Sequence, residues 1–162
     1  MTYSEILIQK YRSKGIVVDT NLLLLLAVGL YDIKRIASFK RTSKFDVQIF
    51  AAVKKVVEQF EQRFTTPYII TELDNWARYL RENEWQAISS ITQQLVPSLI
   101  EVYDQSSRIV RHALYANIGI TDCSIELVQD ALIFTDDLPF SKRMERRGRD
   151  VLNVAHLVLD QS

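Results

Sequence analysis

Short, uniformly apolar runs alternate along the chain with longer segments in which apolar residues recur every three or four positions. The apolar runs, which indicate strands buried on both faces of a sheet, lie at 16–18, 68–70, 131–134 and at Val151-Leu152 with Val154. The longer segments indicate helices between these strands. Strands and helices that alternate in this way are typical of right-handed βαβ units. The pattern therefore predicts an α/β fold, a Rossmann-like three-layer α/β/α sandwich with a central, mostly parallel sheet.

Helix boundaries follow from capping residues and helix breakers. Thr2 and Glu5 have the spacing of a capping box, Gly15 is a stop, and Thr66-Pro67 is expected to break a helix. Helices are predicted at 2–13, from Leu22, at 46–63, from Glu72, at 84–96, at 98–116, from Asp122 and at 141–147. No linker rich in proline, serine or glycine divides the chain. We therefore expect a single domain over 1–162, with an N-terminal helix at 2–13 and a core at 16–154.

Composition narrows the class of protein. With 48% apolar and 25% charged residues, the chain is expected to form a packed core. Twenty basic residues balance twenty acidic ones, so the net charge neither favours nor excludes a nucleic-acid partner. The apolar run from Leu22 to Gly29 is far shorter than the ~20 residues that a spanning helix needs, and no membrane partner is expected. The single cysteine, Cys123, cannot form an internal disulfide, which favours a cytoplasmic protein.

Four acidic residues stand at predicted ends of elements. Asp19 follows the first strand, Glu72 the second and Asp137 the third, while Asp122 opens a helix after Gly119. In open α/β sheets, ligands bind at the carboxyl ends of the strands, so these acids are expected to meet there. Crowded carboxylates raise one another's pKa unless a cation neutralises them, and oxygen ligands suit Mg²⁺ or Mn²⁺. Such an ion can activate water and stabilise the leaving oxygen of a phosphodiester.

Each acid taken alone is more often a helix cap or a solvated charge than a metal ligand. Asp19 is the hardest to explain in this way, because it lies inside the apolar run from Ile16 to Leu26. An unpaired carboxylate buried there would cost on the order of several kcal/mol. The four acids together are therefore a more specific signal than any one of them.

The acids belong to motifs that resemble those of PIN-domain nucleases. The motifs are Val18-Asp19-Thr20-Asn21, Glu72 after Thr71, Thr121-Asp122 and Thr135-Asp136-Asp137. The resemblance spans about residues 16–154 and implies a PIN-like fold. It also implies that the catalytic, metal-binding acids are Asp19, Glu72, Asp122 and Asp137, with Asp136 as a further metal ligand. Asn21 and Thr135 would then orient Asp19 and Asp137 or hold a water on the metal.

The function implied by the resemblance is metal-dependent cleavage of single-stranded or structured RNA, an activity often found in toxins of toxin–antitoxin pairs. An antitoxin-like inhibitory protein and a homodimer are left open as partners. Two features depart from the family pattern: a long helical region between Glu72 and Asp122, and a basic connection at 34–44. Neither removes a motif acid, and neither assigns the chain to the toxin branch.

The basic connection has two interpretations. Its cations are Lys34, Arg35, Lys40, Arg41 and Lys44, and it contains Phe39 followed by Phe45. It is either an RNA-binding rim with a ring for base stacking, or a solvated loop whose aromatic residues complete the core. Trp76, Tyr79 and Trp85 are expected to be core or dimer contacts rather than stacking platforms.

Two other functions are weighed against the ribonuclease. A Mg²⁺-dependent phosphatase or phosphotransfer domain would usually carry a second Asp two positions after the first, and the chain has Asn21 there. A non-catalytic PIN-like scaffold that binds RNA or a protein is the alternative from a different class. Retention of all four acids argues against the scaffold.

Overall fold

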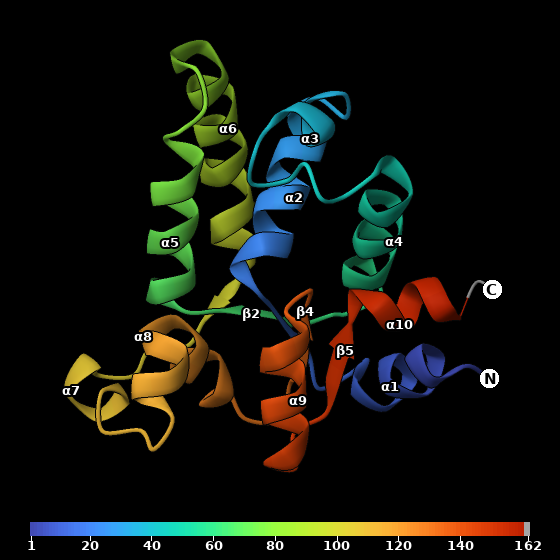
Figure 1. The fold of residues 1–162 in the computed structure, drawn as a ribbon, viewed down its shortest axis with the longest axis vertical. Coiled ribbons are helices and arrows are strands. Elements are labelled where there is room, and N and C mark those ends of the chain that lie inside the picture. The colour runs from blue at the N-terminus through green and yellow to red at the C-terminus, as the bar shows by residue number, and fades with distance from the viewer. Residues whose placement is uncertain (161–162) are drawn as a thin grey trace.

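The computed structural model describes residues 1–160, and the last two residues of the predicted domain, 161–162, lie outside the described residues. Within this range, strands pair into one sheet in the order β3-β2-β1-β4-β5, and every neighbouring pair is parallel. The strands are β1 (Ile16–Val18), β2 (Arg63–Thr65), β3 (Ile100–Glu101), β4 (Leu132–Thr135) and β5 (Val151–Asn153). Helices cover both faces of the sheet (Figure 1). The predicted three-layer α/β/α sandwich is confirmed, with a sheet that is entirely parallel.

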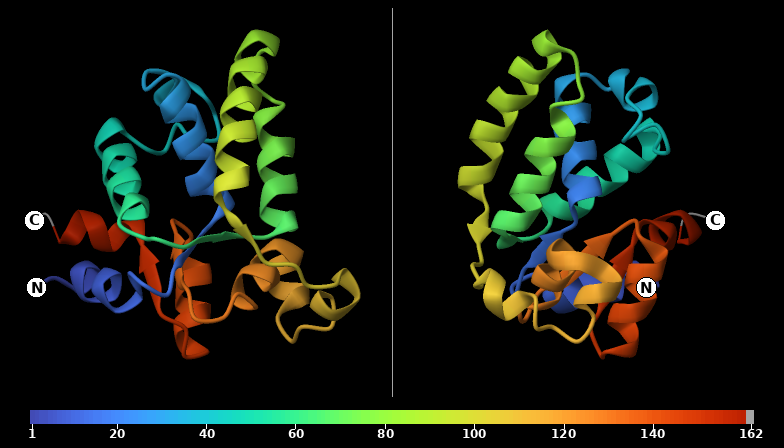
Figure 2. Two further views of the ribbon diagram at one scale, coloured as in Figure 1. Left: turned by 180° about the vertical axis from the view of Figure 1, so that it is seen from behind. Right: turned by 60° about the vertical axis from the view of Figure 1, so that its left-hand side comes forward.

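The helices form two unequal layers (Figure 2). One layer holds α2 (Thr20–Tyr31), α3 (Arg35–Ser38), α4 (Val47–Glu58), α5 (Pro67–Ala77) and α6 (Glu82–Leu95), which ends in the short 3₁₀ turn η1 (Val96–Ser98). The other holds α1 (Tyr3–Tyr11), α7 (Ser106–Ile109), α8 (Tyr115–Glu126) and α9 (Leu138–Arg146). Helix α10 (Val154–Leu159) lies against α1 and α4 beside β5.

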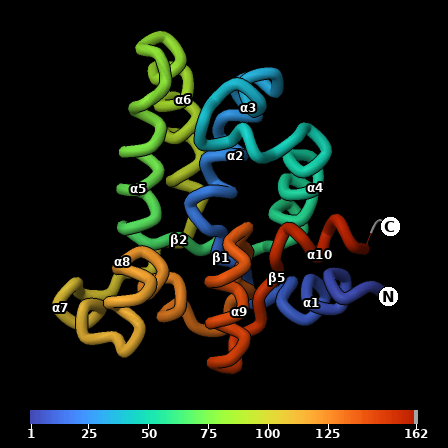
Figure 3. Tube along the Cα trace, viewed as in Figure 1, coloured from blue at the N-terminus to red at the C-terminus, as the bar shows by residue number. Residues whose placement is uncertain are grey.

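Strand β1 and helix α2 form the centre of the molecule (Figure 3). Val17 of β1 pairs with Phe64 of β2 on one side and with Ile133 of β4 on the other. All residues of α2 from Leu22 to Val28 are buried, because α4, α5 and α6 surround the helix. Burial on every side was expected of a helix whose apolar residues follow one another without a polar face.

The strand order places a topological switch point between β1 and β4. From β1 the chain moves outward to β2 and β3, with the connecting helices in one layer. It then returns to β4 and moves to β5 in the opposite direction, with α9 in the other layer. Helices on opposite faces leave a crevice at the carboxyl ends of such neighbouring strands, and ligands bind there in open α/β sheets. Asp19 directly follows β1, and Asp136 directly follows β4.

The predicted second strand at 68–70 is wrong. Thr66 caps a helix by accepting a hydrogen bond from the Ile69 amide, and Pro67 occupies its first turn, so these residues begin α5. Proline lacks only an amide hydrogen that the first turn of a helix does not use, which makes Thr66-Pro67 a helix start. The second strand is instead β2, which begins at the last residue of the helix predicted at 46–63. Glu72 lies within α5 rather than at its start.

The helix predicted at 98–116 is also wrong. This region contains η1, the edge strand β3, the single turn α7 and the beginning of α8. Helix α8 does not begin at Asp122: it starts at Tyr115 and is kinked at Gly119, whose φ is +79°. That left-handed conformation is accessible to glycine without strain. The helix is therefore interrupted only at Gly119 and continues after it.

No helix among residues 1–160 is long and apolar enough to cross a membrane. Helix α2, the most apolar, has 12 residues.

Helix α2 packs so closely on α4 that a methyl group at Gly29 would overlap the ring of Phe50. We expect Gly29→Ala to lower the free energy of unfolding by about 1–3 kcal/mol, because the buried Phe50 ring must shift. Helix propensity alone would instead favour alanine by about 1 kcal/mol. Urea unfolding of the variant measures which effect dominates.

The matched control is Gly29→Ala in a Phe50→Leu background, where the smaller side chain should make room and most of the added loss should disappear. A Gly29→Ala protein as stable as the wild type would show that α2 and α4 are not in contact at this point.

Candidate active site

Asp19 lies buried at the carboxyl end of β1, with 8% of its surface exposed. It caps α2: its Oδ1 accepts a hydrogen bond from the Thr20 amide at 2.6 Å. Its Oδ2 accepts one from the hydroxyl of Thr135 at 2.5 Å. Since Thr135 is the last residue of β4, the two central strands hold this carboxylate between them.

Glu72 reaches the same place from α5. Its Oε2 accepts a hydrogen bond from the hydroxyl of Thr20 at 2.9 Å. Thr20 is fully buried and therefore bridges two acids, with its amide on Asp19 and its hydroxyl on Glu72. Although Glu72 does not start a helix, the contact between α2 and α5 brings it to the end of β1.

Asp122 is carried by the part of α8 that follows the Gly119 kink. Two residues later, the hydroxyl of Ser124 lies 2.8 Å from that of Thr66, the cap of α5. At the end of α8, the buried Glu126 lies 2.7 Å from Nε2 of His112 and forms an ion pair with Arg147 of the α9 C-cap. These contacts fix the segment of α8 that carries Asp122.

The two consecutive acids after β4 have different surroundings. Asp137 caps α9, because its Oδ1 accepts a hydrogen bond from the Phe140 amide at 2.8 Å, and its own amide donates to Thr135 Oγ1 at 3.0 Å. Asp136 forms an ion pair with Lys44 through Oδ2. Its other oxygen, Oδ1, is buried and has no hydrogen-bond partner among the described residues.

The electrostatic interactions link all five acids. Burial, and then the charges of Asp19, Asp137 and Glu72, raise the pKa of Asp122 to about 8. Burial also raises the pKa of Asp19 to about 6; the hydrogen bond from Thr135 opposes this shift, and the charges of Asp136 and Glu72 add to it. Crowded, partly desolvated acids of this kind are typical of functional sites. We call Asp19, Glu72, Asp122, Asp136 and Asp137 the acidic cluster.

The donor chemistry of the acidic cluster fits a hard divalent cation. All five side chains offer carboxylate oxygens, the ligands that Mg²⁺ and Mn²⁺ prefer, and the unpartnered Oδ1 of Asp136 is one more available acceptor. As the side chains stand, however, no group of three or more His, Cys, Asp or Glu residues in the described part of the chain is close enough to hold a metal ion. The residue types therefore fit a cation, whereas in their present arrangement no three of these acids are placed to hold one ion together.

The five predicted RNA-binding cations fall into two groups. Lys40, Arg41 and Lys44 line a cavity of about 930 Å³ together with Asn21, Trp76 and Tyr79, and Phe39 contributes to its wall. Lys34 and Arg35 are not among these lining residues. Arg35 donates to both oxygens of Glu84, from Nε at 2.5 Å and from Nη2 at 3.2 Å, which ties α3 to α6. Phe39 and Phe45 are buried, as expected if the aromatic residues of the loop complete the core.

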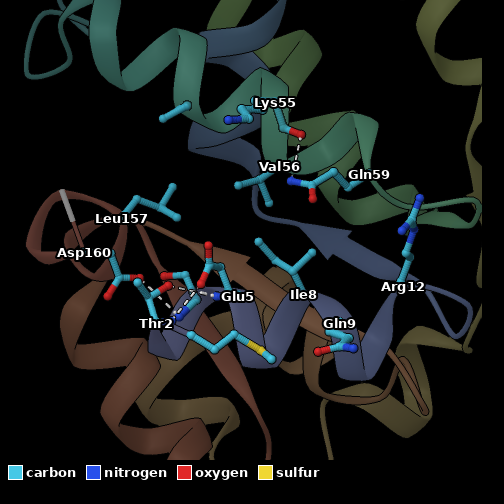
Figure 4. Close-up of a pocket in the computed structure, with 13 residues that line it drawn as sticks. Thr2, Glu5, Ile8, Gln9, Arg12, Lys55, Val56, Gln59, Leu157 and Asp160 are labelled. Carbon is cyan, nitrogen blue, oxygen red and sulfur yellow. Dashed lines mark hydrogen bonds between the residues drawn. The ribbon is translucent and has the colours of Figure 1, made fainter.

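A second hollow, of about 500 Å³, lies between α1, α4 and α10 (Figure 4). Thr2, Glu5, Lys55 and Gln59 border it, and Ile8 with Val56 forms its apolar wall. None of its described lining residues belongs to the acidic cluster. It is therefore separate from the predicted site.

Sequence reasoning missed the roles of three residues in this region. Thr20 stands inside the Val18–Asn21 motif, and its position between two polar residues was the available signal for its bridging role. Trp76, Tyr79 and Trp85 were assigned to core or dimer contacts. Trp76 and Trp85 are partly buried against the core, as expected, but Trp76 and the exposed Tyr79 also line the cavity beside Asn21. Trp76 lies in the last turn of α5 and Tyr79 lies just beyond the C-cap Arg78, so helical spacing could not show that both rings border one cavity.

The raised pKa values predict how stability depends on pH in metal-free protein. Asp122 and Asp19 have an ordinary pKa of 3.8, against about 8 and about 6 in the folded chain. Between these values the folded chain keeps protons that the unfolded chain has released, so its stability should fall as pH rises from about 4 to about 8. Asp122→Asn should remove most of the fall in stability between about pH 6 and pH 8. It should stabilise the protein at pH 8 by on the order of 1–2 kcal/mol. Thermal unfolding with a chelator from pH 4.5 to 8.5 measures both slopes.

Asp74→Asn is the control, because Asp74 lies on α5 in a surface ion pair with Arg78. The stability of Asp74→Asn should change with pH as that of the wild type does. If Asp122→Asn also matched the wild type over the whole range, Asp122 would not be crowded by the other acids.

The sequence matches no family model and no curated protein. Its resemblance to PIN-domain nucleases therefore rests on the motif residues alone. What the protein does has to be inferred from the chemistry of the acidic cluster and its surroundings.

Proposed function

We propose that the protein is a divalent-metal-dependent endoribonuclease that cleaves phosphodiester bonds in single-stranded or structured RNA. The observation that supports this most directly is that five carboxylates from four segments interact at the switch point of a parallel sheet. Their mutual repulsion has no structural benefit, and a cation would remove it. The PIN-like motifs on which the resemblance rests supply these same acids.

In this proposal Asp19, Glu72, Asp122 and Asp137 hold Mg²⁺ or Mn²⁺, with Asp136 as a further acceptor. The cation would activate water and stabilise the leaving oxygen of the phosphodiester. Thr135 and Thr20 orient the acids through the hydrogen bonds that they donate to Asp19 and Glu72. Such supporting contacts usually tune the ligands of a metal site.

The cations next to the acidic cluster support a polyanionic substrate. Lys44 is paired with Asp136, and Lys40 and Arg41 are exposed on the same loop. A basic rim beside an acidic centre attracts the phosphate backbone while leaving the acids to the metal. The two histidines are engaged elsewhere, His112 with Glu126 and His156 with Asn153, so the acids are the better candidates for the chemistry.

The alternative is a non-catalytic scaffold that binds RNA or a protein. It is favoured by one observation: among the described residues, the acids do not stand close enough to form a metal site. A phosphatase or phosphotransfer enzyme has less support, because Asn21 occupies the place of its usual second Asp and borders the cavity. We include in this proposal a cytoplasmic location, an antitoxin-like inhibitor and a homodimer.

The activity can be tested directly. Purified protein with Mn²⁺ or Mg²⁺ should cut single-stranded RNA, and a chelator should stop it. Asp19→Asn and Asp122→Asn should each reduce the rate by about 100-fold or more, since loss of a residue that merely orients a metal ligand already costs about 10–100-fold. Initial rates on an end-labelled RNA measure the effect.

Asp74→Asn, on the same helix as Glu72, should cut like the wild type. Equal, chelator-resistant cutting by all four proteins would reveal a contaminating nuclease and refute the proposal.

Metal binding should also appear as stabilisation, independently of cleavage. An ion that binds only the folded chain adds about 2.7 kcal/mol at a hundredfold excess over its Kd. The melting temperature of the wild type at pH 8 should therefore rise with Mn²⁺, whereas that of Asp122→Asn should rise much less. If Mn²⁺ did not change the melting temperature of the wild type, the scaffold would be favoured. No cation would then relieve the repulsion within the acidic cluster.

A further inference from the structure

The cavity beside the acidic cluster has a composition of its own. It lies between the first turn of α2, the loop after α3 and helix α5, and at about 930 Å³ it falls within the usual range of ligand sites, roughly 300–1,000 Å³. Three of its lining residues are cations and none of its described lining residues is acidic. Two others, Trp76 and Tyr79, present aromatic rings. We call this the aromatic-basic pocket.

Its aromatic surface is open to a ligand. Tyr79 is 79% exposed, which is unusual for a large ring next to a cavity. The guanidinium of Arg41 lies over the ring of Trp76, 4.4 Å from its centroid. The guanidinium and the indole thus lie together beside the exposed Tyr79 ring, and planar bases stack both on guanidinium planes and on aromatic rings.

Its charge favours an anion close to that surface. Lys40 is exposed and has no ion-pair partner within residues 1–160, while Lys44 has Asp136 as its partner. Flat rings beside cations fit a ligand that is planar at one end and anionic at the other, and a nucleotide is such a ligand. In a duplex the flat faces of the bases are already stacked on their neighbours, so the fit requires an unpaired base.

The pocket and the acidic cluster share a border. Asn21, in its lining, comes two residues after Asp19, and Lys44 is paired with Asp136, the neighbour of Asp137. A nucleotide held in the pocket would therefore have its neighbouring phosphodiester near the acids. Substrate seated in this way would be cut at a fixed distance from the bound base.

We propose that the aromatic-basic pocket binds one unpaired nucleotide of single-stranded RNA, with its base on Tyr79 and the Arg41–Trp76 pair and its phosphate at Lys40 and Lys44. The pocket thus selects unpaired substrate and sets the cleavage position. The choice of RNA rests on the proposed function. The requirement for a flat, anionic ligand follows from the pocket itself and is independent of the proposed function.

The test is binding of a fluorescein-labelled, single-stranded RNA decamer, measured by anisotropy with a chelator present so that no RNA is cut. Tyr79→Ala should weaken binding by about 5- to 100-fold, the usual effect of removing one stacking ring, and Tyr79→Phe should bind like the wild type. Lys40→Ala should lower the slope of log affinity against log salt by about 0.7. A duplex of the same sequence should bind more weakly than the single strand.

Tyr3→Ala is the matched control, because Tyr3 is a partly exposed ring at the start of α1, outside the pocket lining. It should leave affinity unchanged. Equal affinities for Tyr79→Ala and wild type, or for duplex and single strand, would overturn the proposal. The proposal would also be overturned if uridine monophosphate displaced the decamer at a concentration equal to that at which the decamer half-saturates the protein. The pocket would then be a site for a free nucleotide.

This outcome is separable from that of the proposed function. Binding that depends on Tyr79, without cleavage in Mn²⁺, would refute the nuclease and keep the pocket. Metal-dependent cleavage with no role for Tyr79 would do the reverse.

Discussion

The arrangement of the site depends on one buried carboxylate at the end of the central strand. Asp19 accepts hydrogen bonds from the Thr20 amide and the Thr135 hydroxyl, so it joins β1, α2 and β4. These bonds offset part of the cost of burying a charge. They do not remove it, because the pKa of Asp19 is still raised to about 6. A purely structural position could be filled by Asn or Ser without that cost, and this is the physical reason to assign Asp19 a function.

The apolar packing around α2 makes this placement possible. Because residues 22–28 of α2 are all buried, the helix is held in the core with its N-terminus at the carboxyl end of β1 (Figure 3). The helices that surround it carry the other polar groups: α5 supplies Glu72 and Trp76, and the loop before α4 supplies Lys44. The same apolar contacts that stabilise the fold therefore set the distances within the site.

The sequence predicted the parts of the fold whose signal is local and strong. Strands β1, β4 and β5 are fully buried, and their mainly apolar sequences identified them. Strand β2 was missed because it reads Arg63-Phe64-Thr65, and β3 because it is a two-residue edge strand with both residues exposed. Tyr68-Ile69-Ile70 was mistaken for a strand because a short apolar run has no period that separates strand from helix.

The acids themselves were visible in the sequence, but their geometry was not. Asp19 and Asp137 cap helices within two residues of the end of a strand, which the motif order indicated. Glu72 and Asp122 lie inside helices, and only tertiary contacts, Thr20 with Glu72 and Ser124 with Thr66, bring them to the sheet. The aromatic-basic pocket could not be predicted either, because tertiary packing alone brings the loop that carries Lys40 next to the segment that carries Tyr79.

The loop between α3 and α4 alternates anchors with cations. Phe39, Thr42 and Phe45 are buried at every third position, and Thr42 donates a hydrogen bond to the Ile36 carbonyl at 2.8 Å. The exposed positions between the anchors carry Lys40, Arg41 and Lys44. The backbone of this loop is thus already ordered before any polyanion arrives. Association would then cost little conformational entropy, so the electrostatic attraction of these cations is available as affinity instead of being consumed in ordering a flexible segment.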